Sequence, residues 1–96
     1  MIEMILNALN QPFAIGILLI LARKKEAKLT DILVELNGIT KYKRIRNTIE
    51  EMIKANLIER RIEIVGAAKK WILRLTSLGQ TLVSYLDQAI KNAIKK

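Results

Sequence analysis

The sequence predicts a mainly α-helical domain with a small β-hairpin, an α+β fold, on three observations. Apolar residues recur at three- and four-residue intervals through most of the chain, which is typical of amphipathic helices. Residues 58–75 change instead to alternation of apolar and other side chains, in two runs separated by a glycine turn. The chain has 96 residues, which suits one domain with a single core and is too short for two.

Two helices are predicted before residue 25. Four apolar residues at helical spacing predict a short first helix: Ile2, Ile5, Leu6 and Leu9. Pro12 suits the first turn of a second helix that runs to about residue 24, with Asn10 or Gln11 as its cap. Its apolar run FAIGILLILA is ten residues long, whereas a membrane span needs about 20. We therefore expect a buried central helix and no membrane association. Gly16 within this helix predicts close packing of a neighbour.

Two more helices are predicted between residues 30 and 56. Thr30 is the expected cap of a helix that ends at Asn37–Gly38, with Ile32, Leu33 and Leu36 on its apolar face. About three residues later, Thr40 is the expected N-cap of a basic helix that runs to about residue 55. Its first turns carry only positive charges, although the helix dipole favours acidic side chains there.

The hairpin is predicted from two alternating runs. Ile58, Ile62 and Ile64 alternate with charged residues in the first strand, and Trp71, Leu73 and Leu75 define the second. Arg60 falls among the apolar positions of the first strand, so we expect it at an edge or a bulge. Residues 65–70 are predicted as a loop that turns at Gly66 and carries Lys69 and Lys70 at its tip.

The last predicted helix follows Thr76 as its cap. Its apolar stripe is Leu78, Leu82, Leu86, Ala89 and Ala93, broadened by Tyr85, Ile90 and Ile94. This stripe is longer than one small core can cover, and an exposed apolar seam usually marks a partner. We expect both terminal helices to form a homodimer interface through Ile2, Ile5, Leu6, Leu9, Leu82, Leu86, Ala89, Ile90 and Ala93. The alternative is that both helices fold back onto their own core.

Composition limits the function. A formal net charge of +8 points to a polyanionic partner, either nucleic acid or an anionic membrane. The chain has no Cys and no His, which excludes disulfides and thiolate metal sites and removes the commonest general base. No acidic residues converge on a recognisable site. We expect no catalytic residues, no metal and no cofactor, and a cytoplasmic location.

The order of elements resembles a winged helix-turn-helix domain of the MarR and ArsR families of transcription regulators. Three segments carry the likeness: 29–40 (LTDILVELNGIT) resembles the positioning helix and its turn, 56–61 (NLIERR) the entry to the wing, and 75–82 (LTSLGQTL) the "LT-x-x-G" start of the following helix. The likeness covers about residues 10–86. It implies a single domain, 1–96, with a DNA-binding core at about 10–76 and dimerisation helices at 1–9 and 77–96.

The resemblance also implies roles for the basic residues. The start of the basic helix would face a duplex, whose phosphates supply the negative charge that its first turns lack. Lys43, Arg44 and Asn47 are then the base-contact candidates, because Lys and Arg can donate to guanine and Asn can bond adenine bidentately. The phosphate and wing candidates are Thr40, Lys41, Tyr42, Arg46, Lys69 and Lys70. Three alternatives stay open: Glu50 competes with DNA for Arg46, Tyr42 packs against the core, and Trp71 serves packing rather than stacking.

The expected function is a dimeric, sequence-specific double-stranded DNA-binding regulator of transcription. Its recognition helix, about 40–55, would lie in the major groove, and its wing, 65–70, on the minor groove or phosphates. The alternatives are an architectural chromatin protein without sequence preference and a winged helix that docks other proteins. An enzyme is the least favoured class. The operator, activation versus repression, and the sensing of any small-molecule effector stay open.

Overall fold

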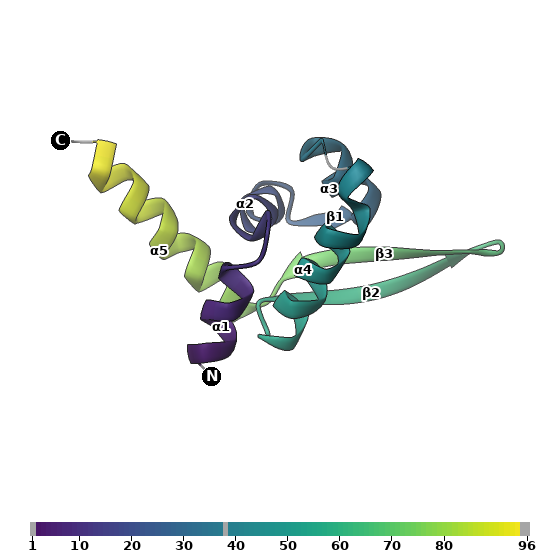
Figure 1. Ribbon diagram of the computed structural model, residues 1–96, viewed down its shortest axis with the longest axis horizontal. Helices are drawn as coiled ribbons and strands as arrows, with labels where there is room; N and C mark the ends of the chain where they lie inside the picture. Colours follow the sequence, from purple (N-terminus) through teal and green to yellow (C-terminus); the bar gives the residue numbers. More distant parts are fainter. Residues whose placement is uncertain (1, 38, 95–96) are drawn as a thin grey trace.

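The computed structural model describes residues 2–37 and 39–94, in a mainly helical fold with one small sheet (Figure 1). The elements are α1 (Ile2–Leu9), α2 (Ala14–Lys24), β1 (Glu26–Lys28), α3 (Leu29–Glu35), a 3₁₀ turn η1 (Ile39–Lys41), α4 (Tyr42–Lys54), β2 (Ile58–Val65), β3 (Ala68–Leu75) and α5 (Ser77–Ile94). The three strands form an antiparallel sheet in the order β1-β3-β2. The predicted α+β class is confirmed.

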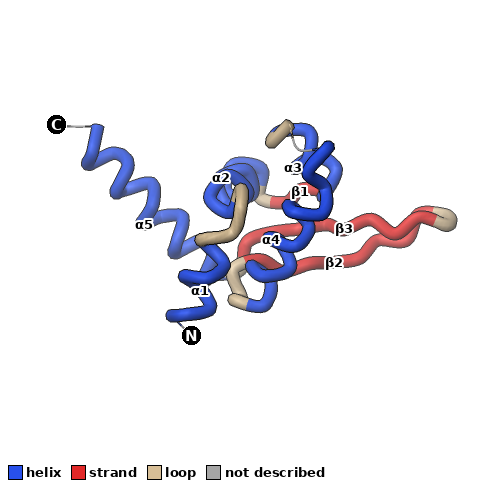
Figure 2. Tube along the Cα trace, viewed as in Figure 1, coloured by secondary structure: helices blue, strands red, loops and turns tan. Residues whose placement is uncertain are grey.

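The molecule is elongated, with extents of 51 × 28 × 22 Å. The β2–β3 hairpin projects from one end of a helical body, and α5 projects from the other (Figure 2). No single helix among the described residues is long and apolar enough to cross a membrane; α1 and α2 meet that test only together, across a 95° bend.

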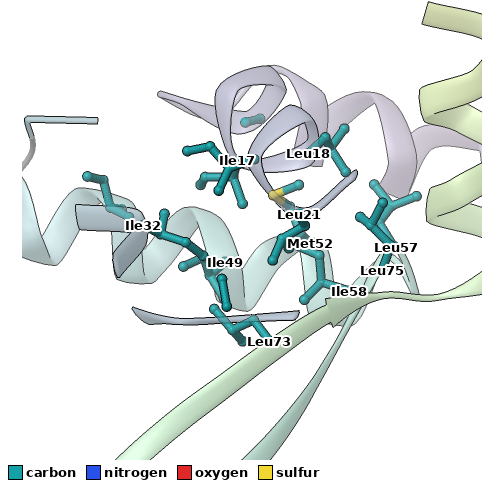
Figure 3. Close-up of a cluster of buried hydrophobic side chains, with 14 of the residues drawn as sticks. Ile17, Leu18, Leu21, Ile32, Ile49, Met52, Leu57, Ile58, Leu73 and Leu75 are labelled. Carbon is teal, nitrogen blue, oxygen red and sulfur yellow. The ribbon is translucent and has the colours of Figure 1, made fainter. Parts of the chain in front are cut away.

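The core lies around α2, as its apolar sequence predicts (Figure 3). Fully buried side chains reach it from four helices, two strands and the turn after α4: Ala8, Ile17, Leu18, Ile32, Ile45, Ile49, Met52, Leu57, Ile58 and Leu73. Gly16 allows the close approach predicted for it, since a Cβ there would lie 3.0 Å from Leu36 Cδ2. Buried Thr48 places its hydroxyl 2.8 Å from the Pro12 carbonyl oxygen and 3.0 Å from that of Arg44, so the polar group has partners.

Strand β1 was not predicted. It has three residues, too few for alternation to be detected. It exists because it pairs with β3, from Glu26 opposite Arg74 to Lys28 opposite Ile72. The pairing places β3 in the centre of the sheet and leaves β2 at an edge, which is where Arg60 was expected.

Three predicted helix starts are wrong. Helix α2 begins after Phe13, which has a left-handed backbone with φ of 65°, so Pro12 lies in the preceding turn. Thr30 lies inside α3, because β1 delivers the chain to Lys28 in the extended conformation that an N-cap needs. Thr40 lies in η1, and α4 has Lys41 at its N-cap without a side-chain capping bond. Tertiary contacts in the preceding turns outweigh the local capping preference.

The other predicted helix boundaries hold better. The Gly79 amide donates to Thr76 Oγ1 at 3.0 Å, and the Thr76 hydroxyl donates to the Asn56 carbonyl at 2.6 Å. Thr76 is therefore the cap of α5, as predicted. Asn37 and Asn56 follow α3 and α4 with left-handed φ values of 52° and 61°, as expected for residues that end a helix. Gly38 lies outside the described residues.

Candidate nucleic-acid interface

Helix α4 has two chemically distinct faces. Ile45, Ile49 and Met52 recur once per helical turn and are fully buried on one face. Lys43, Arg44 and Asn47 are all exposed. The first turn of α4 contains no acidic residue, so its amide dipoles and its cations produce positive potential in the same place.

The residues just before α4 are also accessible. Thr40 and Lys41 are exposed, and Lys41 Nζ lies 5.4 Å from the centroid of the Phe13 ring. Tyr42 is 42% exposed. The alternative in which Tyr42 packs into the core is therefore wrong, because the first turn of α4 extends past the end of the buried face.

Arg46 does not pair with Glu50, contrary to the competition suggested by their spacing. Its guanidinium lies over the Trp71 ring, 4.8 Å from the centroid. The Arg60 guanidinium lies over the same ring at 4.5 Å, and Arg60 Nη1 donates to Glu50 Oε1 at 3.5 Å. A cation is attracted to the face of an aromatic ring, and only the folded sheet brings Trp71 to α4. Trp71 is therefore half-buried and holds two arginines, besides packing.

The hairpin turn is shorter than predicted. Strands β2 and β3 are separated only by Gly66, which has φ of 63°, and Ala67. Lys69 and Lys70 are therefore strand residues, opposite Ile64 and Glu63 respectively. Successive strand residues point to opposite faces, so Lys69 shares the face of Trp71 and Lys70 does not. The prediction that Lys69 and Lys70 lie in a loop is wrong, because strand β3 already begins at Ala68.

The sheet face that carries Arg74 holds paired charges. Arg74 bonds Glu59, Arg61 Nη1 lies 3.2 Å from Glu26 Oε1, and Arg61 Nη2 lies 4.0 Å from Glu63 Oε2. Exposed ion pairs contribute little to stability. These ion pairs matter for the distribution of charge. They neutralise the acidic residues of the hairpin on the sheet face that carries Arg74, and not beside α4.

A cleft of about 310 Å³ lies between α4, the start of α3 and β3. Its lining includes four cations and two aromatic residues: Lys28, Arg46, Lys69, Lys70, Tyr42 and Trp71. No acidic residue is among the described residues that line it. Lys28 was missed as a candidate because it belongs to the unpredicted strand β1, so no local pattern could place it beside α4.

A larger cleft, about 900 Å³, lies between α2, α5 and the base of the hairpin. Glu59 and Arg74, two of its three charged lining residues, bond each other, so its charge is mostly compensated. Within residues 2–37 and 39–94, no group of acidic side chains could hold a metal ion. The positive charge around α4 and the smaller cleft is therefore less compensated than that of the larger cleft.

Solved structures of other proteins share the fold of this chain. No protein-family model and no curated protein matches the chain. A transcriptional regulator homologue from Pyrococcus horikoshii OT3 superposes with a TM-score of 0.75 at 16% identity, over 93% of this chain and 86% of that one. Diamide-treated YodB from B. subtilis gives 0.73 at 17% identity, over 97% and 89%. The chain has a winged helix-turn-helix fold.

The winged-helix arrangement assigns positions to the elements. Helices α3 and α4 form the helix-turn-helix, α4 has the place of the recognition helix, and the β2–β3 hairpin is the wing. The MarR- and ArsR-type resemblance is thus confirmed for the fold. The base candidates lie on α4, while the phosphate candidates lie on η1, α4 and the wing.

The dimer candidates of this winged helix divide into two sets. Ile5, Leu9, Leu82 and Leu86 are partly buried and pack against their own core. Ile2, Leu6, Ala89, Ile90 and Ala93 are exposed. The inner part of each terminal helix thus follows the fold-back alternative, whereas the outer part leaves an apolar surface uncovered in the single chain.

Proposed function

We propose that this protein binds double-stranded DNA as a dimeric, sequence-specific regulator of transcription. The observation that carries the proposal is the exposed set Lys43, Arg44 and Asn47 on α4, in the recognition-helix position, with the opposite face held in the core. One of the similar structures is a transcriptional regulator homologue. The net charge of +8 suits a polyanionic duplex.

The proposed contacts follow from the chemistry of the side chains. The N-terminal half of α4 enters the major groove, where Asn47 bonds adenine N6 and N7 and Lys43 or Arg44 donates to guanine. Thr40, Lys41 and Tyr42 contact phosphates and set the register without selecting a sequence. Placing cations at the positive end of a helix costs a few tenths of a kcal/mol each. Contacts with phosphate offset that cost.

A homodimer completes the proposal. The apolar surface on the outer parts of α1 and α5 includes Ile2, 73% exposed, and Ile90, 47% exposed. Burying it against a second copy would stabilise a pair of winged helices through the hydrophobic effect. Two-fold symmetry then predicts an inverted repeat with half-sites about one helical turn, roughly 34–36 Å, apart.

Sequence reading is tested by Asn47→Ala, on a duplex first obtained by selection from a random pool. If Asn47 bonds a base, its loss costs about 1–3 kcal/mol on the selected duplex and much less on random DNA. Lys41→Ala should weaken both alike, because a phosphate contact carries no sequence information. Affinities are measured by fluorescence anisotropy at one fixed salt concentration.

Asn7→Ala is the matched control, since Asn7 is exposed on α1 and is not among the proposed DNA contacts. It should leave both affinities unchanged. Equal losses for Asn47→Ala on the two duplexes would favour the architectural alternative. A wild-type chain that binds no duplex would support the protein-docking alternative instead.

The wing lysines are expected to differ. Both lysines line the cleft beside α4, but Lys70 lies directly across from the acidic Glu63, whereas Lys69 lies across from Ile64. Lys69→Ala should therefore weaken binding to all duplexes and reduce the slope of log affinity against log salt by about one unit. Lys70→Ala should have a smaller effect on both. Isothermal titration at several salt concentrations measures the slopes, and equal effects would contradict the compensation of Lys70 by Glu63.

A further inference from the structure

The cleft beside α4 gathers cations from three elements far apart in sequence. Lys28 comes from the end of β1, Arg46 from α4, and Lys69 and Lys70 from β3. The described lining supplies no carboxylate to compensate them. Like charges gathered in one concavity repel each other, and a bound anion relieves that repulsion. The cleft is therefore suited to an anionic ligand.

Arg46 is held in a way that leaves its hydrogen-bonding capacity free. Its guanidinium carbon lies over the Trp71 ring, 4.8 Å from the centroid, in a contact that involves no carboxylate. The five N–H donors lie in the plane, along the edge, in a fork that matches two oxygens of a phosphate. Among the hydrogen bonds and ion pairs of the described residues, none involves this guanidinium. Trp71 thus holds Arg46 in place while its N–H donors have no hydrogen-bond partner among the described residues.

Arg60 shows the contrast. It lies over the same ring at 4.5 Å, but its charge is partly neutralised by Glu50, 3.5 Å away. The ion pair of Glu50 is thus with Arg60 and not with Arg46. Of the two arginines over Trp71, Arg60 is therefore compensated by a carboxylate, whereas Arg46 has no such partner among the described residues.

The position of the cleft identifies its ligand. The major and minor grooves of a duplex are separated by one sugar-phosphate backbone. A protein with α4 in the major groove and the wing at the adjacent minor groove receives that backbone between the two elements. The cleft lies between α4 and β3 of the wing.

We propose that this cleft binds the sugar-phosphate backbone of one DNA strand. Arg46 and Lys28 are its phosphate ligands, and Trp71 is the positioning residue that holds Arg46 at the cleft. The inference rests on the proposed binding of duplex DNA, but it does not depend on sequence specificity. It also assigns a role to Lys28, which lies outside both α4 and the wing.

The test uses a random-sequence duplex of about 20 base pairs, titrated into the full chain at several salt concentrations. Lys28→Ala and Arg46→Met should each weaken binding several-fold and reduce the salt slope by about 0.9 per lost phosphate contact. Trp71→Leu removes no charge, yet it should weaken binding nearly as much as Arg46→Met. In the Arg46→Met background, Trp71→Leu should have little further effect, because the two residues act as a unit.

Three controls separate positioning from general damage. Arg46→Lys keeps the charge but lacks the planar fork, so it should lower affinity while retaining most of the salt slope. Lys91→Ala removes a cation on α5 that pairs with Asp87 and should change neither quantity. Trp71 is the sole tryptophan, so its emission in the wild-type chain should change when the duplex saturates the protein.

The outcomes distinguish this inference from the proposed function. If the wild-type chain binds the duplex but exposed Lys28 and Arg46 can be replaced without loss of affinity or slope, the cleft assignment is overturned and DNA binding stands. Additive effects of Trp71→Leu and Arg46→Met would overturn the positioning role. If the wild-type chain binds no duplex at any salt concentration, the proposed function itself fails.

Discussion

Gly79→Ala is expected to lower the free energy of unfolding by about 3 kcal/mol, near the upper end of the usual cost of overpacking. A Cβ at this position would lie well within 3.0 Å of the Leu57 carbonyl oxygen and 3.2 Å from its carbonyl carbon. The obstacle is backbone rather than a flexible side chain. The same carbonyl accepts the Thr76 amide at 3.1 Å, so moving it would break the bond that leads into α5.

Helix propensity opposes this effect but is smaller. Alanine is favoured over glycine inside a helix by about 1 kcal/mol, so a net loss means that the steric term dominates. The first turn of α5 would have to move away from the junction between α4 and β2. Urea denaturation followed by circular dichroism measures the change in the free energy of unfolding.

Two other glycines provide matched controls. At Gly16 the nearest atom to an added Cβ is the end of the Leu36 side chain, at 3.0 Å, which can rotate. At Gly66 the surroundings are open, and only the left-handed φ of 63° opposes a side chain, at about 1–2 kcal/mol. Gly79→Ala should be the most destabilising of the three. A smaller cost than at Gly16 would contradict the close approach of α5 to Leu57.

Ile90→Glu is expected to convert the proposed dimer to monomers and to weaken binding to an inverted-repeat duplex by about 10²–10⁴-fold. Each half of a dimer raises the effective concentration of the other at its half-site, and a monomer loses that gain. Ile90 is 47% exposed and lies beyond Leu86, the last residue of α5 that packs against the core. The substitution should therefore leave the monomer folded. A change at Leu86 could unfold the monomer as well, because Leu86 packs against the core.

Ser84→Glu is the control for this substitution. It adds the same charge to α5 at an exposed residue that helical periodicity places opposite the apolar stripe. Sedimentation should find dimers for Ser84→Glu and monomers for Ile90→Glu. Both variants should remain folded, so that the loss of the dimer cannot be attributed to unfolding. A wild-type chain that sediments as a monomer at roughly tens of micromolar would rule out the dimer.

The helical period by itself determined which side of α4 is buried. Ile45, Ile49 and Met52 recur once per turn, and burying them leaves Lys43 and Asn47 on the other side wherever the helix is placed. The cap at Thr76 could be predicted in the same way, because the Thr76 hydroxyl accepts a hydrogen bond from the amide of Gly79, only three residues later. Such features depend only on neighbours along the chain, so the sequence is sufficient to predict them.

The tertiary structure alone decided how the charges are distributed around α4. Arg46 has an acid at helical spacing, yet it stacks on Trp71, which is 25 residues away in sequence. Lys28 joins the same cleft through a strand that exists only because it pairs with β3. Spacing along one helix predicts which side chains could meet, whereas the choice among competing partners depends on which elements the core brings together. The partners of Arg46 and Lys28 were set by that packing.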